Sequence, residues 1–163
     1  NMKYLGPMAH SIVNAIKYVP GSRFQIISDS LKKCPVELLP ITSFIPWKPG
    51  IEFSTIPRWS VGIMPLADDE WTRGKCAFKL LQYLSAGIPC VASPVGMNKT
   101  VMEQADVGYS ADKESEWSES LITLLSNPPL RDRLGNRGRQ LVEECYSLEV
   151  VARLWLNALQ KLL

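Results

Sequence analysis

The sequence predicts an α/β fold in which a parallel β-sheet is covered by helices on both faces. Short apolar segments with the character of strands alternate with longer segments whose apolar residues recur at helical spacing. One of the short segments, PCVAS at 89–93, is almost unbroken in its apolar character, which is typical of a parallel strand buried on both faces. The 163 residues, 46% hydrophobic and 21% charged, fit one globular domain with its own core.

The first half of the chain predicts two strands between helical segments. Gly21 is suited to end the first helix, and prolines mark the loop that follows the first strand. The elements expected here are a helix at 3–19, a strand at 23–28, a loop at 29–40, a strand at 41–47 and a weak helical turn at 51–57.

The second half predicts three more extended segments and a helical end. Gly87 again follows a helix, and the Pro128-Pro129 pair separates two of the last helices. The elements expected here are a strand at 60–66, a helix at 75–86, a strand at 89–93, a helix at 98–105, an extended piece at 107–111, and helices at 114–126, 129–144 and 147–163.

Composition excludes several classes of function. A net charge of +2 is too small for a general polyanion binder, so we expect no nucleic-acid partner. The four cysteines lack CxxC spacing and there is one histidine, which argues against a metal site. No apolar run is long enough to cross a bilayer and no signal peptide is recognisable. Together with the cysteine usage, this predicts a cytoplasmic location.

Ligands of open parallel sheets bind beyond the carboxyl ends of the strands. In this chain that rule selects the loops at 28–33, 46–50, 67–74 and 94–98. The loop at 67–74 leads into the predicted helix at 75–86, whose free amides and positive dipole end would face the crevice.

Three polar residues of that helix predict a local anion site. Lys75, Lys79 and Gln82 are spaced so that they share one face of a helix. Gly74 allows a ligand to approach the backbone, and the glutamine amide can bond a hydroxyl group. These residues suggest a nucleotide or a nucleotide-sugar. The alternative is a helix whose lysines only solvate its outer face.

The loop SPVGMN at 93–98 strengthens the first alternative. It follows the strand at 89–93, so its amides would lie next to the start of the preceding helix in a parallel sheet. Its Gly96, Met97 and Asn98 are candidates for ligand contact. The other interpretation is a tight turn that requires Gly96 only for its backbone angles.

The same segments resemble the donor-binding part of family 4 (group 1) glycosyltransferases of the GT-B type. Residues 62–98 carry the resemblance with GIMPLADDEWTRGKCAFKLLQYLSAGIPCVASPVGMN, and residues 131–155 with RDRLGNRGRQLVEECYSLEVVARLW. The likeness covers nearly the whole chain from about residue 3.

The resemblance implies that residues 1–163 form the single Rossmann-like, carboxyl-terminal domain of such an enzyme. It further implies that the amino-terminal acceptor domain and the first strand of this domain are absent from the sequence. Enzymes of this family transfer a hexose from a nucleoside-diphosphate sugar, usually with retention of configuration. We therefore expect no cofactor and no catalytic metal. We also expect peripheral membrane association, if there is any, through the acceptor domain.

The resemblance also assigns roles to residues. Lys75 and Lys79 would hold the diphosphate with the helix amino terminus and stabilise the leaving group. Gly96, Met97 and Asn98 would contact sugar or phosphates through backbone groups. The segment from Phe44 to Trp47 would line the base pocket.

At two positions the sequence departs from the family. Many relatives carry two glutamates eight residues apart, where this chain has Gly74 and Gln82. Glutamine can still bond ribose but lacks the charge. One acid of the run 68–70 could replace the first glutamate, or the run could be a solvated loop.

Two hypotheses for the function follow. The first is the donor-binding domain of a retaining glycosyltransferase, inactive alone, that serves polysaccharide, lipopolysaccharide or glycoconjugate synthesis. The second is a non-catalytic nucleotide-binding module with a GT-B-like fold, in which the changed glutamates ended catalysis.

Overall fold

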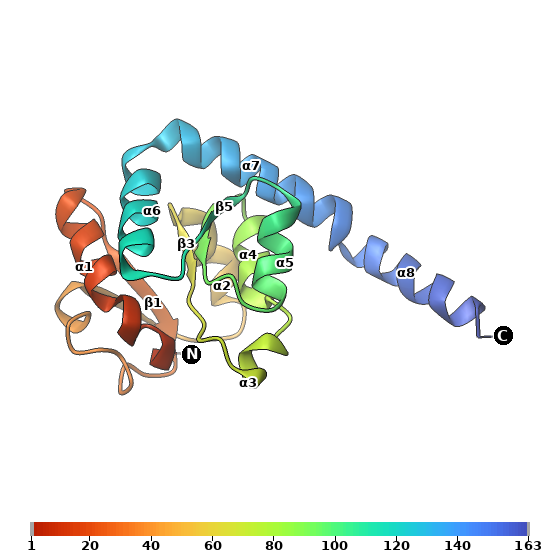
Figure 1. Cartoon of the computed structure of the whole chain (residues 1–163), viewed down its shortest axis with the longest axis horizontal. Helices are drawn as coiled ribbons and strands as arrows, with labels where there is room; N and C mark the ends of the chain where they lie inside the picture. Colours follow the sequence, from red (N-terminus) through yellow and green to blue (C-terminus); the bar gives the residue numbers. More distant parts are fainter. Residues whose placement is uncertain (1, 163) are drawn as a thin grey trace.

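The structure, a computed structural model, describes residues 2–162; Asn1 and Leu163, at the ends of the predicted domain, lie outside the described residues. Five parallel strands lie between helices (Figure 1). They are β1 (Phe24–Ser28), β2 (Thr42–Pro46), β3 (Gly62–Met64), β4 (Cys90–Ala92) and β5 (Gly108–Ser110). The predicted α/β architecture is therefore confirmed.

The helices occupy most of the predicted segments. They are α1 (Ala9–Tyr18), α2 (Ile51–Thr55), α3 (Glu70–Arg73), α4 (Phe78–Ser85), α5 (Met97–Gln104), α6 (Glu114–Ser126), α7 (Pro128–Cys145) and α8 (Leu148–Gln160). Short 3-10 turns lie at Met2–Tyr4, Gly6–Met8, Leu39–Ile41 and Ile56–Arg58.

Two helix boundaries were predicted wrongly. The helix expected at 3–19 begins only at Ala9, after two 3-10 turns, because Pro7 lacks an amide hydrogen and Gly6 weakens a helix. The helix expected at 75–86 begins at Phe78, and the separate short helix α3 precedes it.

The strands form two sheets rather than one. β1 pairs with β2, and β3, β4 and β5 pair in that order; every pairing is parallel. Within residues 2–162, no strand ladder joins β1 to β3. The expected single sheet is thus interrupted at its centre, where a cavity separates the two strands.

β4 lies at the centre of the core, as its apolar run predicts. Cys90 and Ala92 pack in the cluster that contains α4, whereas Val91 packs in the cluster that contains α1 and α6. All three residues have 0% exposed surface. The alternation places one helix layer on each face of the sheet.

α8 differs from the other helices because it projects from the body of the molecule (Figure 1). None of its described residues is buried, and several large apolar side chains are exposed on it, including Leu154, Trp155 and Leu159. Among residues 2–162, no helix combines the length with the apolar character that crossing a membrane requires.

Candidate functional site

The loop after β3 is ordered by a capping box at the start of α3. The backbone amide of Thr72 donates to Asp69 Oδ1 at 2.7 Å, and the Asp69 amide donates to Thr72 Oγ1 at 3.1 Å. Thr72 has 0% exposed surface. The hydrogen bond from the Thr72 amide, with one from its hydroxyl group, lowers the pKa of Asp69.

The other acids of this loop are exposed, and one of them is paired. The Arg73 guanidinium donates to both carboxylate oxygens of Asp68, at 2.6 and 3.0 Å, and lowers the pKa of that carboxyl group. Two of the three acids at 68–70, Asp68 and Asp69, therefore hold the loop in shape through hydrogen bonds. The solvated loop that was one interpretation of the sequence does not describe these two.

The polypeptide changes direction between α3 and α4. Lys75 donates its amide to the Thr72 carbonyl at 3.1 Å, which closes the short helix. Ala77, which is buried, then takes the left-handed conformation at φ 53° and ψ 24°. Lys75 consequently precedes α4, and the predicted shared stripe of Lys75, Lys79 and Gln82 is wrong for its first member.

Lys75 faces the amino-terminal segment. Its Nζ lies 4.6 Å from the centre of the Tyr4 ring and 3.5 Å from the Tyr4 hydroxyl oxygen. Tyr4 itself is buried. The lysine is thus held at the rim of the sheet by an aromatic partner that no sequence motif marks.

Lys79 and Gln82 lie on the first turns of α4 and line the cavity between β1 and β3. No side chain caps this helix, so its first amides are available to a ligand. The cavity has a volume of about 1150 Å³. Phe78, which is exposed, adds an apolar side chain to the same rim.

Trp47 reaches the same cavity from the end of β2. Its indole nitrogen donates to Glu52 Oε1 at 2.6 Å, and the residue as a whole remains 47% exposed. The backbone amide of Glu52 and the Trp47 indole lower the pKa of Glu52, with a smaller contribution from Lys79. Of the predicted base-pocket segment, Ile45 and Trp47 line the cavity, whereas Phe44 does not.

Gly96 lies in the neighbouring loop, at the start of α5. A Cβ atom at this position would lie 2.6 Å from the Arg73 carbonyl oxygen, and the backbone has φ 51° and ψ −133°. The loops at 67–74 and 94–98 are therefore adjacent, as the sequence predicts. The contact, however, is with the end of α3 rather than with the start of α4.

Met97 and Asn98 open α5 in different ways. Asn98 is 1% exposed; its amide side chain donates to the Met64 carbonyl at 3.3 Å, while Oδ1 has no partner among the described residues. Its backbone amide donates to Val95. Asn98 therefore connects β3 to α5, and the half-buried Met97 is the better placed of the two for ligand contact.

The structure thus brings Trp47, Lys79 and Gln82 together around one cavity. Gly74, Lys75, Gly96, Met97 and Asn98 do not line it. Glu52 and Phe78 were not predicted from the sequence, although both are close in the chain to residues that were: Glu52 follows Trp47 by five positions, and Phe78 precedes Lys79.

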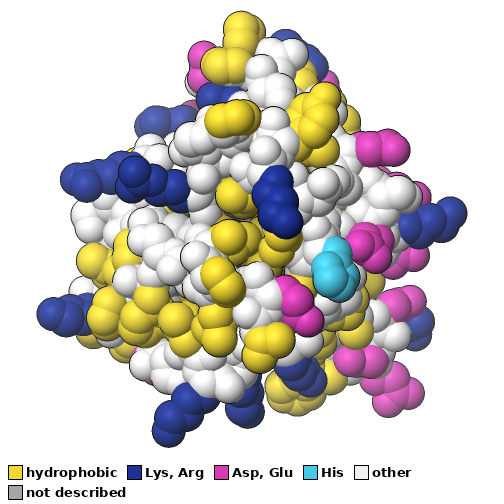
Figure 2. Space-filling model, turned by 90° about the vertical axis from the view of Figure 1, so that its left-hand side faces the viewer, with side chains coloured by type: hydrophobic (Ala, Val, Ile, Leu, Met, Phe, Trp, Pro, Cys, Tyr) yellow, Lys and Arg dark blue, Asp and Glu magenta, His cyan; other side chains and the backbone are white. Residues whose placement is uncertain are grey.

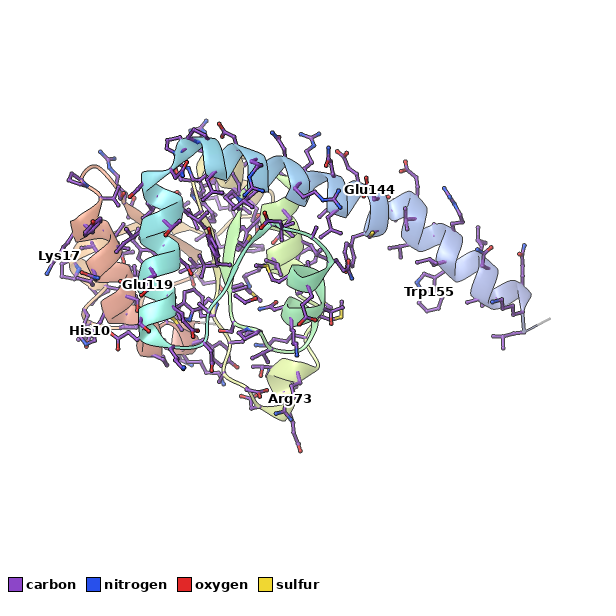
Figure 3. The ribbon with its side chains drawn as sticks, turned by 45° about the horizontal axis from the view of Figure 1, so that its top comes forward. His10, Lys17, Arg73, Glu119, Glu144 and Trp155 are labelled. Atoms are coloured by element: carbon purple, nitrogen blue, oxygen red, sulfur yellow. The ribbon has the colours of Figure 1, made fainter. Side chains whose placement is uncertain are left out.

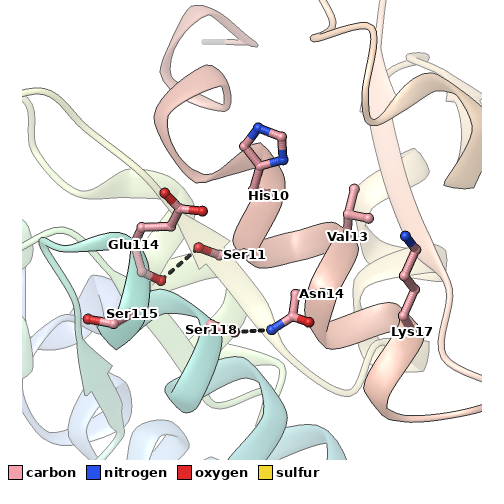
Figure 4. A pocket seen from close by; sticks show the side chains of 8 residues that line it. All are labelled: His10, Ser11, Val13, Asn14, Lys17, Glu114, Ser115 and Ser118. Carbon is pink, nitrogen blue, oxygen red and sulfur yellow. Dashed lines mark hydrogen bonds between the residues drawn. The ribbon is translucent and has the colours of Figure 1, made fainter.

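A second, shallower hollow of about 630 Å³ lies between α1 and α6 (Figure 4). Ser11 donates to the Glu114 carbonyl at 2.7 Å, and Asn14 donates to Ser118 at 2.8 Å. These bonds join the two helices. His10 is exposed at the edge of the hollow, with acidic side chains near it on this face (Figure 2).

Nowhere in residues 2–162 do three or more His, Cys, Asp or Glu side chains gather closely enough to hold a metal ion. The site described above is instead built from a helix amino terminus, lysine and amide side chains and an aromatic ring. Such a set suits an anion joined to hydroxyl groups and a flat ring system.

Comparison with known proteins gives a family match over part of the chain. Residues 73–141 match the sequence model of the family described as "Glycosyl transferases group 1". This range includes α4 with Lys79 and Gln82, the loop at 94–98 and most of α7. No curated protein matches the sequence significantly.

Solved structures share the fold at low sequence identity. A mutant of S. aureus TarM, in complex with fondaparinux, alpha-GlcNAc-glycerol and UDP, has a TM-score of 0.73 and 15% identity; the match covers 96% of this chain and 33% of that one. WaaG, a glycosyltransferase involved in lipopolysaccharide biosynthesis, has a TM-score of 0.69 and 14% identity, with coverages of 88% and 41%. Sucrose-phosphate synthase from Thermosynechococcus elongatus has a TM-score of 0.70 and 15% identity, with coverages of 96% and 42%.

This chain spans between a third and about two fifths of the length of those structures. At such identities the likeness concerns the fold, which is that of the GT-B glycosyltransferases. The family match and the shared fold together confirm the resemblance to a carboxyl-terminal domain of group 1 glycosyltransferases.

Proposed function

We propose that this chain binds a nucleoside-diphosphate sugar as the donor domain of a glycosyltransferase. The observation that carries the proposal is the convergence of Trp47, Lys79 and Gln82, from two separate segments, on one cavity that runs along β1 and β3. Trp47 follows the carboxyl end of β2, and α4 follows β3, so Trp47 and Lys79 lie toward the carboxyl ends of the strands. In open parallel sheets this is the usual place for a ligand. TarM, with which the chain shares its fold, was solved with UDP.

The roles of the residues follow from their chemistry. The uncapped amides of α4 and the Lys79 ammonium group would hold the diphosphate and stabilise its negative charge as the sugar departs. Lys75, which is held against Tyr4 at the rim of the sheet, would add to the positive electrostatic potential around the diphosphate. Gln82 would bond ribose hydroxyl groups, and the Trp47 ring would stack on the base.

The remaining predicted residues would act through the backbone. Gly74 keeps the loop before α4 free of a side chain, and Gly96 and Met97 present the start of α5 to the sugar or its phosphate. The reaction would retain configuration and need neither cofactor nor metal. The acceptor would bind to a second domain, which would also make any peripheral contact with a membrane, in the cytoplasm.

Titration calorimetry tests donor binding directly. UDP, GDP and ADP, and their glucose conjugates, are titrated into the chain and into its Lys79→Ala variant. We expect the variant to bind the preferred nucleotide about 10- to 100-fold more weakly, because a hydrogen bond to a charged group contributes about 1.5–3 kcal/mol.

Lys17→Ala provides the matched control, because Lys17 is an exposed lysine on α1. It lies on a different part of the molecule from Arg73, the last residue of α3 (Figure 3). Its affinity should equal that of the unchanged chain. Absence of heat with every nucleotide, or equal losses in both variants, would contradict the proposal.

A second candidate function is a non-catalytic nucleotide-binding module. It is favoured by Gly74 and Gln82, which stand where many relatives carry glutamates. The protein that carries this domain together with an acceptor domain should distinguish the two. Sugar transfer that is lost in Gln82→Ala would support the enzyme, whereas nucleotide binding without any donor turnover would support the module.

A further inference from the structure

Glu52 lines the same cavity as Trp47, Lys79 and Gln82 but takes no part in holding a diphosphate or a ribose. It is half-buried and lies on the first turn of α2. Its Oε1 atom accepts from the Trp47 indole nitrogen at 2.6 Å. The carboxylate therefore lies beside the aromatic ring that is available to stack on a base.

The backbone holds Glu52 and Trp47 in this relation. The Trp47 amide donates to the Ser28 carbonyl at 3.0 Å, which fixes the residue to the end of β1. Gly50 takes the left-handed conformation at φ 82°, which lets the chain turn and begin α2. The position of the acid thus follows from the turn after β2 as well as from its own side-chain contact.

Glu52 is an anion at neutral pH. Its own backbone amide and the Trp47 indole lower the pKa of its carboxyl group, and the charge of Lys79 lowers it further. An ionised carboxylate only accepts hydrogen bonds, at about four positions, of which these two donors occupy about two. The carboxylate therefore offers acceptor positions, and no donor, to a ligand in the cavity.

Orientation of the Trp47 ring does not by itself require an acid. A glutamine at position 52 could also accept from the indole. Glutamate differs from glutamine in its charge and in the absence of a donor. The ligand group that uses both differences is a pair of neighbouring N–H donors, because each oxygen of a carboxylate can accept one of them.

The nucleobases differ in the hydrogen-bonding groups along their pairing edges. Guanine presents two adjacent donors, the N1–H group and the N2 amine. Uracil presents one N–H donor between two carbonyl oxygens, and adenine presents an amine beside an acceptor nitrogen. An anionic oxygen opposite such an acceptor is repelled and stays unpaired. The Glu52 carboxylate thus complements guanine and opposes the other two bases.

We propose that Glu52 selects guanine and that the donor is accordingly a guanosine-diphosphate sugar. The base lies on the Trp47 ring, its N1–H group and N2 amine donate to the Glu52 carboxylate, and Lys79 at the start of α4 holds the diphosphate. Glu52 contributes to the choice of donor rather than to sugar transfer. This inference rests on the proposed donor-binding function.

Calorimetry on the unchanged chain compares GDP with inosine diphosphate (IDP), UDP and ADP. IDP differs from GDP only in lacking the N2 amine, so it removes one of the two hydrogen bonds to Glu52. We expect GDP to bind at least about tenfold more tightly than IDP, because a hydrogen bond to a charged group contributes a factor of about 10 to 100. UDP and ADP should bind more weakly still. Equal affinities for GDP and IDP would overturn the proposal.

Glu52→Gln tests the residue itself. Glutamine keeps an acceptor for the Trp47 indole but replaces the other oxygen with an amine, so the preference for GDP over UDP should shrink at least about tenfold. The ratio of the two affinities is the readout, because loss of a negative charge near Lys79 strengthens the binding of every diphosphate alike. Glu119→Gln, a change of an exposed acid on α6, is the matched control and should leave the ratio unchanged.

The remaining outcomes contradict the proposal. A ratio that Glu52→Gln leaves unchanged would mean that the acid only orients the Trp47 ring, and equal losses for GDP and UDP would mean that it contacts the ribose, which both nucleotides share. If Lys79→Ala still weakens binding in either case, the donor site stands without selectivity for guanine. Absence of heat with every nucleotide removes both proposals. If Glu52→Gln does not fold, the comparison of GDP with IDP in the unchanged chain still decides.

Discussion

Among single residues, Asp69 and Thr72 determine the shape of the loop before α4. Their mutual bonds cap α3, and the buried Thr72 side chain holds the loop against the body. Gly96 then packs on the Arg73 carbonyl oxygen, so the cap also sets the position of the neighbouring loop. A change at Asp69 should therefore be felt beyond its own exposed side chain.

The cap predicts a pH-dependent effect of Asp69→Ala. Because the pKa of Asp69 is lowered in the folded chain, its carboxylate contributes stability above its unfolded pKa. That contribution is lost as the pH falls through the lower, folded value. Asp69→Ala should thus lower the melting temperature at pH 7 and have a smaller effect at about pH 2.5.

Circular dichroism melts at the two pH values provide the measurement. Glu119→Ala is the control, because Glu119 is an exposed acid of α6, far from Arg73 and α3 (Figure 3). The prediction fails if the effect of Asp69→Ala is the same at both pH values.

At the residue scale, the sequence predicted which residues lie near the site better than it predicted where each of them lies. Lys79 and Gln82 lie on one helix because their spacing decides it. Lys75 does not join them, since Ala77 takes a left-handed conformation that alanine rarely adopts and that spacing cannot reveal. The Lys75–Tyr4 contact joins residues 71 positions apart and depends wholly on the tertiary fold.

At the scale of elements, two helices are joined where their backbones nearly touch. A Cβ atom on Gly135 of α7 would lie 2.0 Å from the carbonyl oxygen of Gly87, directly after α4. A Cβ atom on Gly138 would lie 2.8 Å from the buried Leu84 side chain. Small residues at these positions therefore allow α7 to support the helix that carries Lys79 and Gln82.

Gly135→Ala should destabilise the protein through this contact. The new methyl group meets backbone rather than a flexible side chain, so α7 must shift; we expect a loss of at least about 2 kcal/mol in the free energy of unfolding. Urea denaturation measures it. Asn136→Ala, at the next and exposed position, should cost less than about 0.5 kcal/mol, and similar losses in the two variants would contradict the explanation.

The strands could be predicted because apolar runs between turn residues are local signals, and β4 is buried on both faces as its composition requires. The separation into two sheets could not. It depends on which strand edges meet, and a sequence pattern carries no information on that. The first helix begins later than predicted because of the Gly6-Pro7 pair, which is a local signal. The prediction gave more weight to the apolar periodicity than to this pair.

At the scale of the whole molecule, charge is distributed in local pairs. The basic stretch of α7 illustrates this: Arg133 pairs with Asp106 at 2.7 Å and Arg139 with Glu143 at 2.9 Å. Arg131 donates to the carbonyls of Leu124 and Leu125 at the end of α6. The net charge of +2 is therefore not concentrated on this helix.

This distribution predicts selectivity for a small phosphate ligand over a polyanion. Nucleic acids bind through many simultaneous phosphate contacts, whereas a cavity with Lys79 at a helix start offers only one or two. In fluorescence anisotropy at about 150 mM salt, a labelled 20-base-pair duplex should not bind at protein concentrations that saturate with the preferred nucleotide. A double variant that carries both Arg133→Ala and Arg139→Ala should leave the affinity for the nucleotide unchanged. Duplex binding that this variant abolishes would show that α7 is a nucleic-acid surface after all.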